Sequence, residues 1–234
     1  ARGGAGAAAR GRDARRRVYH AAPAFPGPRA MRDQLYRKGP DLVDFAFDAD
    51  VARVFPDMIR RSVPGYELIV PMTGVLAGLH QVPGTTAFDL GCSRGATLVA
   101  IERYGGGRAS RLVGVDDAPA MIEACRILDL PGAGFRCEDV RTTMLDDAGF
   151  VALNFTLQFL APEDRTPLLE RVHRALAATA RAATEPPDGG RAAGALVVSE
   201  KVIRPDGAVE ARMREAHEAF KRANGYSELE IAGK

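Results

Sequence analysis

The residues with the clearest potential for chemistry are a glycine turn and an acid that follows it along the chain. The run 87–95, A-F-D-L-G-C-S-R-G, is an apolar stretch that breaks into a turn at Gly91, and Asp116 ends the next apolar stretch. A glycine between a strand and a helix lets a ligand approach the backbone, because no side chain holds the ligand away. An acid roughly twenty residues further on is placed to accept hydrogen bonds from both hydroxyls of a ribose. This pattern indicates a site for S-adenosylmethionine or a dinucleotide.

The spacing within the turn distinguishes between these two ligands. Cys92 and Ser93 follow the first glycine, so the turn departs from G-x-G-x-x-G, and the sequence contains no G-x-x-x-x-G-K-[ST] motif. A cradle for phosphate groups is therefore not indicated. The turn suits a ligand that has an amino-acid end and no pyrophosphate. The alternative is a glycine turn that serves only the packing of a strand against a helix.

Further acidic candidates follow the second and third predicted strands. Asp117 stands beside Asp116 and is either a second solvated acid at the strand end or the cap of the following helix. Asp139 can accept a hydrogen bond from the exocyclic amine of adenine, while the backbone amide of Val140 meets a ring nitrogen. An exposed acid before a helix is the alternative interpretation of Asp139.

An amide and a tyrosine complete the candidate set. Asn154 interrupts an apolar run, and because a buried amide without partners is costly, we expect it to face a ligand rather than fill the core. Tyr66 follows a Pro-Gly turn and can lean over the cofactor from the N-terminal helices, although spacing alone does not decide this. Cys92 is interpreted as a small apolar contact and not as a nucleophile. No Ser/His/Asp or Cys/His set is recognisable, so the catalytic residue is left unassigned.

Composition excludes several other classes of protein. No window approaches the run of about eighteen apolar residues that a membrane span needs. The three cysteines form no C-x-x-C pair and the four histidines are scattered, so neither a disulfide framework nor a metal site is predicted. Residues 1–30 carry a net charge of +6, which leaves −4 on the other 204 residues. A mildly acidic body is a poor electrostatic match for a phosphate backbone, so we expect no direct binding of nucleic acid.

The elements that position these residues alternate between strand and helix. The predicted strands are 86–90, 111–115, 134–138, 150–155 and 195–199, and the predicted helices are 48–61, 67–79, 96–104, 119–130, 162–178 and 207–224. This alternation predicts an α/β fold with a doubly wound, mostly parallel sheet. Residues 180–194 are rich in Ala, Pro and Gly, and we interpret them as a flexible surface insertion.

The chain divides into an N-terminal extension, 1–44, and a cofactor-binding domain, 45–234. Residues 1–30 are mostly Ala, Gly, Arg and Pro and cannot build a core, which predicts disorder. An arginine-rich leader that lacks acids is also typical of organellar transit peptides, although such peptides are usually rich in serine and this one has none. We expect a cytoplasmic protein, with import into an organelle as the alternative.

Several longer runs together are similar to carboxy-S-adenosyl-L-methionine synthases, a family within the class I (Rossmann-like) methyltransferase superfamily. The similarity extends from about residue 45 to the end, and the runs that carry it are D-L-G-C-S and the segments 54–66, 118–123, 153–160, 199–201 and 220–230. The first and last of these segments are far more specific than a glycine turn.

The resemblance implies an unusual reaction. Enzymes of this family use S-adenosylmethionine as the acceptor of a carboxyl group from prephenate, which leaves as phenylpyruvate. The positive sulfur acidifies its methyl group, hydroxide from prephenate removes the proton, and the resulting ylide captures CO2. The protein would mainly position two ligands and exclude water. The product, carboxy-S-adenosyl-L-methionine, would pass to a partner enzyme that modifies the wobble uridine of certain tRNAs.

The resemblance also implies a set of cofactor contacts, a homodimer and no metal. The contacts carried over by position are Tyr66, Gly91, Cys92, Ser93, Asp116, Asp117, Asp139, Val140 and Asn154. Arg94 replaces an expected apolar residue and Asp117 replaces a usual asparagine. The family continues beyond Lys234 with an arginine and the final antiparallel edge strands, so we expect a C-terminally truncated domain. An ordinary S-adenosylmethionine-dependent methyltransferase and a non-catalytic binding module are the alternatives.

Overall fold

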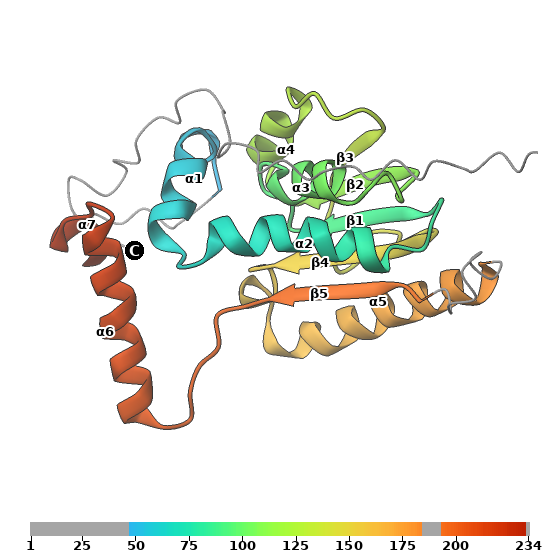
Figure 1. Cartoon of the computed structure of the whole chain (residues 1–234). Helices are drawn as coiled ribbons and strands as arrows, with labels where there is room; N and C mark the ends of the chain where they lie inside the picture. Colours follow the sequence, from blue (N-terminus) through green and yellow to red (C-terminus); the bar gives the residue numbers. More distant parts are fainter. Residues whose placement is uncertain (1–46, 184–192, 233–234) are drawn as a thin grey trace, which may run out of the picture.

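A five-stranded parallel sheet organises the part of the chain that the computed structural model describes, residues 47–183 and 193–232 (Figure 1). The sheet has the order β3-β2-β1-β4-β5, and all four neighbouring pairs are parallel. The strands are β1 Thr86–Leu90, β2 Arg111–Asp116, β3 Ala133–Cys137, β4 Ala148–Asn154 and β5 Ala195–Ser199. This confirms the predicted doubly wound α/β fold. The predicted extension, 1–44, lies outside the described residues.

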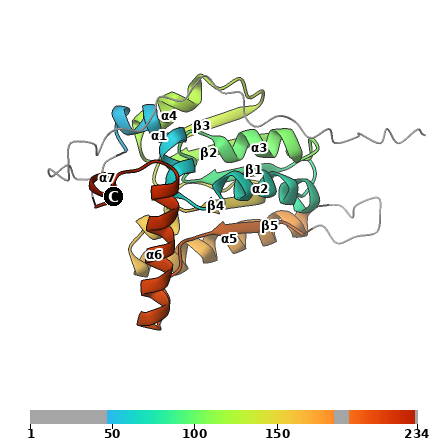
Figure 2. The same cartoon turned by 60° about the vertical axis from the view of Figure 1, so that its left-hand side comes forward.

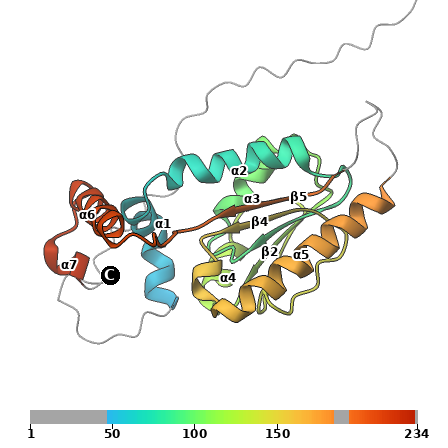
Figure 3. The same ribbon diagram turned by 90° about the horizontal axis from the view of Figure 1, so that it is seen from below.

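Helices cover both faces of the sheet. They are α1 Ala49–Ser62, α2 Tyr66–His80, α3 Ala96–Tyr104, α4 Pro119–Arg126, α5 Pro162–Ala182, α6 Gly207–Ala223 and α7 Glu228–Ala232, with a short 3-10 helix, η1, at Leu157–Phe159. Figure 3 shows α2 and α5 on opposite faces of the sheet. Burial on both faces explains why the central strands are nearly continuous apolar runs without polar alternation.

Two apolar clusters, one on each face, hold the layers together. Phe150 and Leu98 pack on the side of α2 and α3, whereas Phe88, Leu153 and Leu168 pack on the side of α5. All five side chains are almost completely buried. Burying a large apolar side chain stabilises a fold by about 1.5–3 kcal/mol, so these clusters fix the strand ends that carry the site.

The helices α1 and α6 lie beyond the carboxyl ends of the strands, and α6 projects away from the body (Figure 2). Asp48 caps α1 by accepting a hydrogen bond from the amide of Val51 at 2.9 Å. The Arg61 side chain ties α1 to the end of α6 by donating to the Asn224 carbonyl at 2.7 Å. Within the described residues, no helix combines the length and the apolar character that a membrane span requires.

Several predicted boundaries are wrong. Helix α4 ends at Arg126 instead of 130, and Leu128 beyond it packs against the buried cluster of Cys92, Ile122 and Cys125. Helix α5 continues to Ala182, so the start of the predicted surface insertion is helical, and residues 184–192 lie outside the described part. Strand β4 stops at Asn154, before Phe155. The short helix α7 was not predicted.

Candidate functional site

A cavity of about 420 Å³ opens at the carboxyl edge of the sheet. It is bounded by the loops that follow β1, β2, β3 and β4 and by the inner side of α1. This edge is where open α/β sheets bind ligands. The cavity is lined by all nine residues for which the sequence predicts cofactor contacts, namely Tyr66, Gly91, Cys92, Ser93, Asp116, Asp117, Asp139, Val140 and Asn154. Their contact with a ligand stays a prediction.

The glycine turn after β1 brings backbone to the cavity wall. The φ angle of Gly91 is 80°, a left-handed conformation that favours glycine. The amides of Gly91 and Cys92 both donate to the Val115 carbonyl, at 2.8 and 2.9 Å. A Cβ atom on Gly91 would lie 2.7 Å from the Cγ2 atom of Thr156. The position therefore requires glycine for both its conformation and its contacts.

The carboxylate of Asp116 is fixed by two loops at once. Its Oδ2 atom accepts a hydrogen bond from the Ser93 amide at 2.8 Å, and its Oδ1 atom accepts one from the Ala118 amide at 3.0 Å. Burial raises the pKa of Asp116, although these two amides act in the opposite direction. Each oxygen keeps a lone pair for a further donor. This geometry can accept two hydroxyl groups of a ribose.

Polar side chains form a network on the inner side of the cavity. The Asn154 amide nitrogen lies 3.2 Å from the Thr97 hydroxyl and 3.4 Å from the Thr73 hydroxyl. Asp89 does not line the cavity but is hydrogen-bonded to Thr97, which does. Among the described residues, the Asn154 Oδ1 and Asp89 Oδ1 atoms are buried without a hydrogen-bond partner. Of these two acceptors, the Asn154 oxygen belongs to a residue that lines the cavity, so it suits a ligand that brings a donor or positive charge.

Asp89 was not predicted as a site residue, although it is within the run 87–95 that contains the glycine turn. It is 1% exposed, and burial raises its pKa to about 7, with Asp116 adding to the effect and Thr97 opposing it. The signal in the sequence was an acid within an otherwise apolar strand. Thr97 and Thr73 carried no such signal, because threonine is common in helices and caps.

Replacing Asp89 by asparagine is expected to stabilise the ligand-free protein at pH 8 and to have little effect at pH 4. Between the unfolded pKa of 3.8 and the folded pKa of about 7, the folded protein holds a proton that the unfolded chain has lost. Stability of the wild type therefore falls as pH rises through this window and stays lower above it, by an amount on the order of 4 kcal/mol. Urea unfolding at both pH values measures this difference.

The matched control for this prediction is Asp129→Asn, an exposed acid outside the cavity. Its free energy of unfolding should differ from that of the wild type by the same small amount at pH 4 and pH 8. A stabilisation of Asp89→Asn that does not depend on pH would contradict the prediction.

Asp139 is part of an ion-pair network that follows β3. Its carboxylate pairs with Arg141 at 2.6 Å, and Arg141 also pairs with Asp164 on α5 at 2.7 Å. These contacts hold the pKa of Asp139 below its ordinary value. All three side chains line the cavity beside the buried Val140. Arg141 and Asp164 were not predicted as site residues, and no partner was predicted for Asp139.

Aromatic residues from the segment before α1, from the start of α2 and from the loop after β4 form the apolar wall of the cavity. The rings of Tyr66 and Phe155 lie 6.4 Å apart, and those of Phe47 and Phe159 lie 5.4 Å apart in an edge-to-face arrangement. Phe155 has a φ angle of 62°, which is a strained conformation for a bulky residue. Burial raises the pKa of Tyr66, so its phenol is neutral. Tyr66 thus lines the cavity, and its contact with a ligand stays a prediction.

The remaining predicted positions fit less specific roles. Cys92 is buried, and the neighbouring Cys125 together with burial raises the pKa of its thiol, which agrees with an apolar contact and not with a nucleophile. Asp117 is exposed at the rim of the cavity. Among the described residues, no group of three or more His, Cys, Asp or Glu side chains is placed to hold a metal ion.

Fold and sequence comparison agree on the class of protein. The strand order, the flanking helices and the glycine turn define a class I, Rossmann-like methyltransferase fold. Residues 87–179 match the family model described as "Methyltransferase domain". A phosphoethanolamine N-methyltransferase 1 structure of Haemonchus contortus, solved with S-adenosylhomocysteine, aligns at a TM-score of 0.44 and 15% identity, covering 67% of this chain and 33% of that one. The chain is an S-adenosylmethionine-dependent enzyme of the transferase type.

Curated relatives specify the family. A protein of Marinobacter nauticus named carboxy-S-adenosyl-L-methionine synthase is 44% identical over 213 residues, which cover 88% of this chain and 79% of that protein. Its namesake in Aliivibrio salmonicida is 43% identical over 197 residues, covering 82% of this chain and 75% of that protein. This chain belongs to the carboxy-S-adenosyl-L-methionine synthase family.

Proposed function

We propose that this protein makes carboxy-S-adenosyl-L-methionine from S-adenosylmethionine and prephenate, and that it releases phenylpyruvate. The observation that carries the proposal is the 44% identity to a synthase of that name across 88% of the chain. The cavity supports it, because the fixed Asp116 carboxylate suits the adenosine ribose and the polar network around Asn154 suits the amino-acid end. S-adenosylmethionine is a substrate in this reaction and not a resident cofactor.

The proposed chemistry needs little from side chains beyond binding and orientation. Prephenate becomes aromatic by losing CO2 and hydroxide, and the hydroxide takes a proton from the sulfonium methyl group to form water. The methyl carbon then bonds to CO2, so that the products are carboxy-S-adenosyl-L-methionine, phenylpyruvate and water. Among the described residues that line the cavity there is no histidine or lysine, which supports a route in which the substrate supplies the base. The aromatic wall would exclude water from the captured CO2.

Mass spectrometry of the products tests the proposal directly. The chain is incubated with S-adenosylmethionine, with and without prephenate, and the expected product is heavier than S-adenosylmethionine by one CO2 and forms only when prephenate is present. S-adenosylhomocysteine together with a methylated acceptor would instead indicate an ordinary methyltransferase. Unchanged S-adenosylmethionine in both reactions, with binding intact, would indicate a binding module.

The wider setting is also proposed from the family. The product would supply an enzyme that modifies the wobble uridine of tRNA, and the protein would act as a homodimer in the cytoplasm without binding nucleic acid or membranes itself. The net charge of −4 on residues 31–234 supports the absence of a nucleic-acid surface. Sedimentation of the purified protein, with and without tRNA, tests both the dimer and the absence of binding.

A further inference from the structure

The side-chain amide of Asn154 is held on its nitrogen side by two buried threonines. Its Nδ2 atom donates to the Thr97 hydroxyl at 3.2 Å and to the Thr73 hydroxyl at 3.4 Å. Because an NH2 group carries two hydrogens, these bonds use both of its donors. Among the described residues, the Oδ1 atom of the same amide is buried and has no hydrogen-bond partner. The amide therefore keeps one unused function, an acceptor, at a residue that lines the cavity.

The direction of the neighbouring hydrogen bonds explains why the nitrogen of Asn154, and not its oxygen, faces the threonines. The Thr73 hydroxyl donates its single hydrogen to the Ile69 carbonyl, one turn earlier in α2, at 3.0 Å. It can then only accept from the amide. The Thr97 hydroxyl is hydrogen-bonded to the buried Asp89 carboxyl group and acts to lower its pKa, which is the effect of a donor to a carboxylate. A turned amide would place its oxygen against two hydroxyl oxygens whose hydrogens are used elsewhere.

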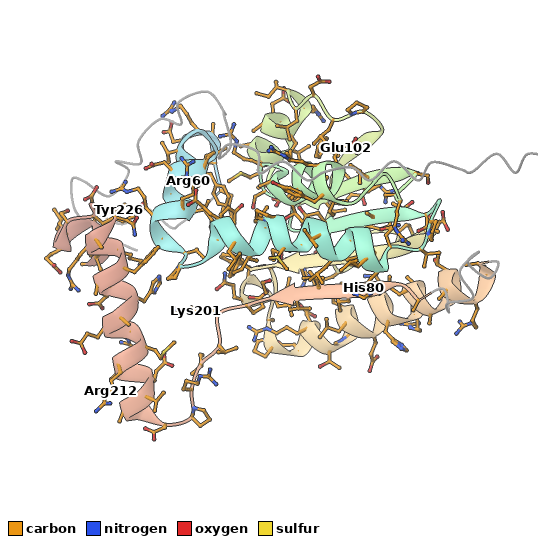
Figure 4. All side chains as sticks on the ribbon, in the orientation of Figure 1. Arg60, His80, Glu102, Lys201, Arg212 and Tyr226 are labelled. Carbon is orange, nitrogen blue, oxygen red and sulfur yellow. The ribbon has the colours of Figure 1, made fainter. Side chains whose placement is uncertain are left out.

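The two threonines reach the same amide because α2 and α3 pack closely. Gly74 follows Thr73, and a Cβ atom at Gly74 would lie 2.3 Å from a backbone oxygen of α3. Only 1% of Thr73 and 5% of Thr97 is exposed. The outer surfaces of these helices carry exposed polar side chains instead, such as His80 and Glu102 (Figure 4). The hydroxyl pair thus belongs to the tightly packed contact between two helices.

We propose that Thr73 and Thr97 are positioning residues that make Asn154 present its carbonyl oxygen, and not its NH2 group, to the cationic part of S-adenosylmethionine. A carbonyl oxygen attracts a positively charged group, whereas an NH2 group in its place would repel it. The ligand has two such groups, the ammonium group of its amino-acid end and the sulfonium with its polarised methyl group. Thr73 does not line the cavity, so its effect passes through Asn154. The inference uses S-adenosylmethionine as the ligand and does not depend on prephenate or on carboxyl transfer.

Three ligands that share the adenosine group test the inference by isothermal titration. S-adenosylmethionine carries the ammonium and the sulfonium charge, S-adenosylhomocysteine carries only the ammonium group, and methylthioadenosine carries neither. Thr73→Val removes the hydroxyl and keeps a side chain of similar size. It is expected to weaken the binding of S-adenosylmethionine by about three- to tenfold, the value of one hydrogen bond, and to change the Kd of methylthioadenosine by less than about twofold. Thr73→Ser keeps the hydroxyl and should restore the affinity.

The pattern of losses distinguishes positioning from general damage to the site. Weaker binding of both charged ligands identifies the ammonium group as the partner of Asn154, and weaker binding of S-adenosylmethionine alone identifies the sulfonium. Equal weakening of all three ligands, or no weakening of any, overturns the proposal. Thr179→Val is the matched control, because Thr179 is a buried threonine of α5 that does not line the cavity. It should change none of the three dissociation constants.

A second variant and a separate assay keep this inference distinct from the proposed function. Thr97→Val should show the same selective loss, and it decides the matter if urea unfolding shows that Thr73→Val does not fold. Product formation from prephenate is measured on the wild type in parallel. If the product forms but both valine variants keep the wild-type affinities, the positioning role is wrong and the function stands. If no product forms but the valine variants lose affinity for the charged ligands alone, the function is wrong and the positioning role stands.

Discussion

Replacing Asp116 by asparagine is expected to weaken the binding of S-adenosylmethionine by about 100-fold or more. Two hydrogen bonds from ribose hydroxyls to a carboxylate contribute about 1.5–3 kcal/mol each, and 1.4 kcal/mol corresponds to a factor of ten. The asparagine would also place an NH2 group against the Ser93 or the Ala118 amide, where the wild-type carboxylate accepts both. The binding pocket therefore loses an acceptor for the ligand and gains a repulsive contact between donors. Isothermal titration with S-adenosylmethionine measures the effect.

The control for this variant is Asp129→Asn, which removes one exposed acid outside the cavity. It should bind S-adenosylmethionine with the affinity of the wild type. Because it changes the net charge by the same amount as Asp116→Asn, it controls for the effect of overall charge. Urea unfolding of both variants shows how much of the lost affinity for S-adenosylmethionine comes from destabilisation of the two loops that Asp116 joins. If Asp116→Asn binds S-adenosylmethionine as tightly as the wild type, Asp116 does not hold the ribose.

Replacing Gly91 by alanine is expected to destabilise the fold and to remove most S-adenosylmethionine binding. The φ angle of 80° costs a residue with a Cβ atom about 1–2 kcal/mol. The new methyl group also collides with Thr156, whose hydroxyl donates to the Leu90 carbonyl at 2.7 Å. Overpacking of this kind adds about 1–3 kcal/mol. Urea unfolding and ligand titration measure the two losses separately.

Gly132→Ala separates strain from collision. Gly132 has a φ angle of 76°, but a Cβ atom there would meet nothing within 4 Å. This variant should show only the conformational cost and should keep its affinity for S-adenosylmethionine. Adding Thr156→Ala to Gly91→Ala should recover part of the lost stability, because it removes the side-chain atoms of Thr156 that collide with the new methyl group. Equal destabilisation by Gly91→Ala and Gly132→Ala would show that Thr156 moves away from the new methyl group without a loss of stability.

The strands of the sheet were predictable because the pattern that indicates each strand is contained in its own few residues. Each strand is a short apolar run that ends in a turn, and β1 was predicted with the observed bounds, Thr86–Leu90. The candidate acids were predictable for the same reason, since Asp116 and Asp139 follow such runs directly. Parallel strands then bring their carboxyl ends to one edge without further information. The lining of the cavity by the eight candidates at or after the strand ends is a consequence of topology, whereas Tyr66 is at the start of α2.

The features that the sequence did not reveal depend on long-range contacts. Arg141 meets Asp164 across two elements, and no spacing rule connects residues that far apart. The pattern of α1 predicted an amphipathic helix, but not that Phe55 and Met58 would line the cavity. In each case tertiary packing, and not local propensity, decides the outcome.

The strand order has a kinetic consequence. Because no neighbouring strands are joined by a hairpin, β1 gains its partner β2 early in synthesis but stays unpaired on its other edge until residues 148–154 have left the ribosome. Strand β4 likewise has one unpaired edge until β5 has been synthesised. Unpaired edges of buried, apolar strands are prone to aggregate, and non-local parallel pairing is slow. The nascent chain that ends between β3 and β5 is therefore the stage at which unpaired apolar strand edges are most exposed to aggregation.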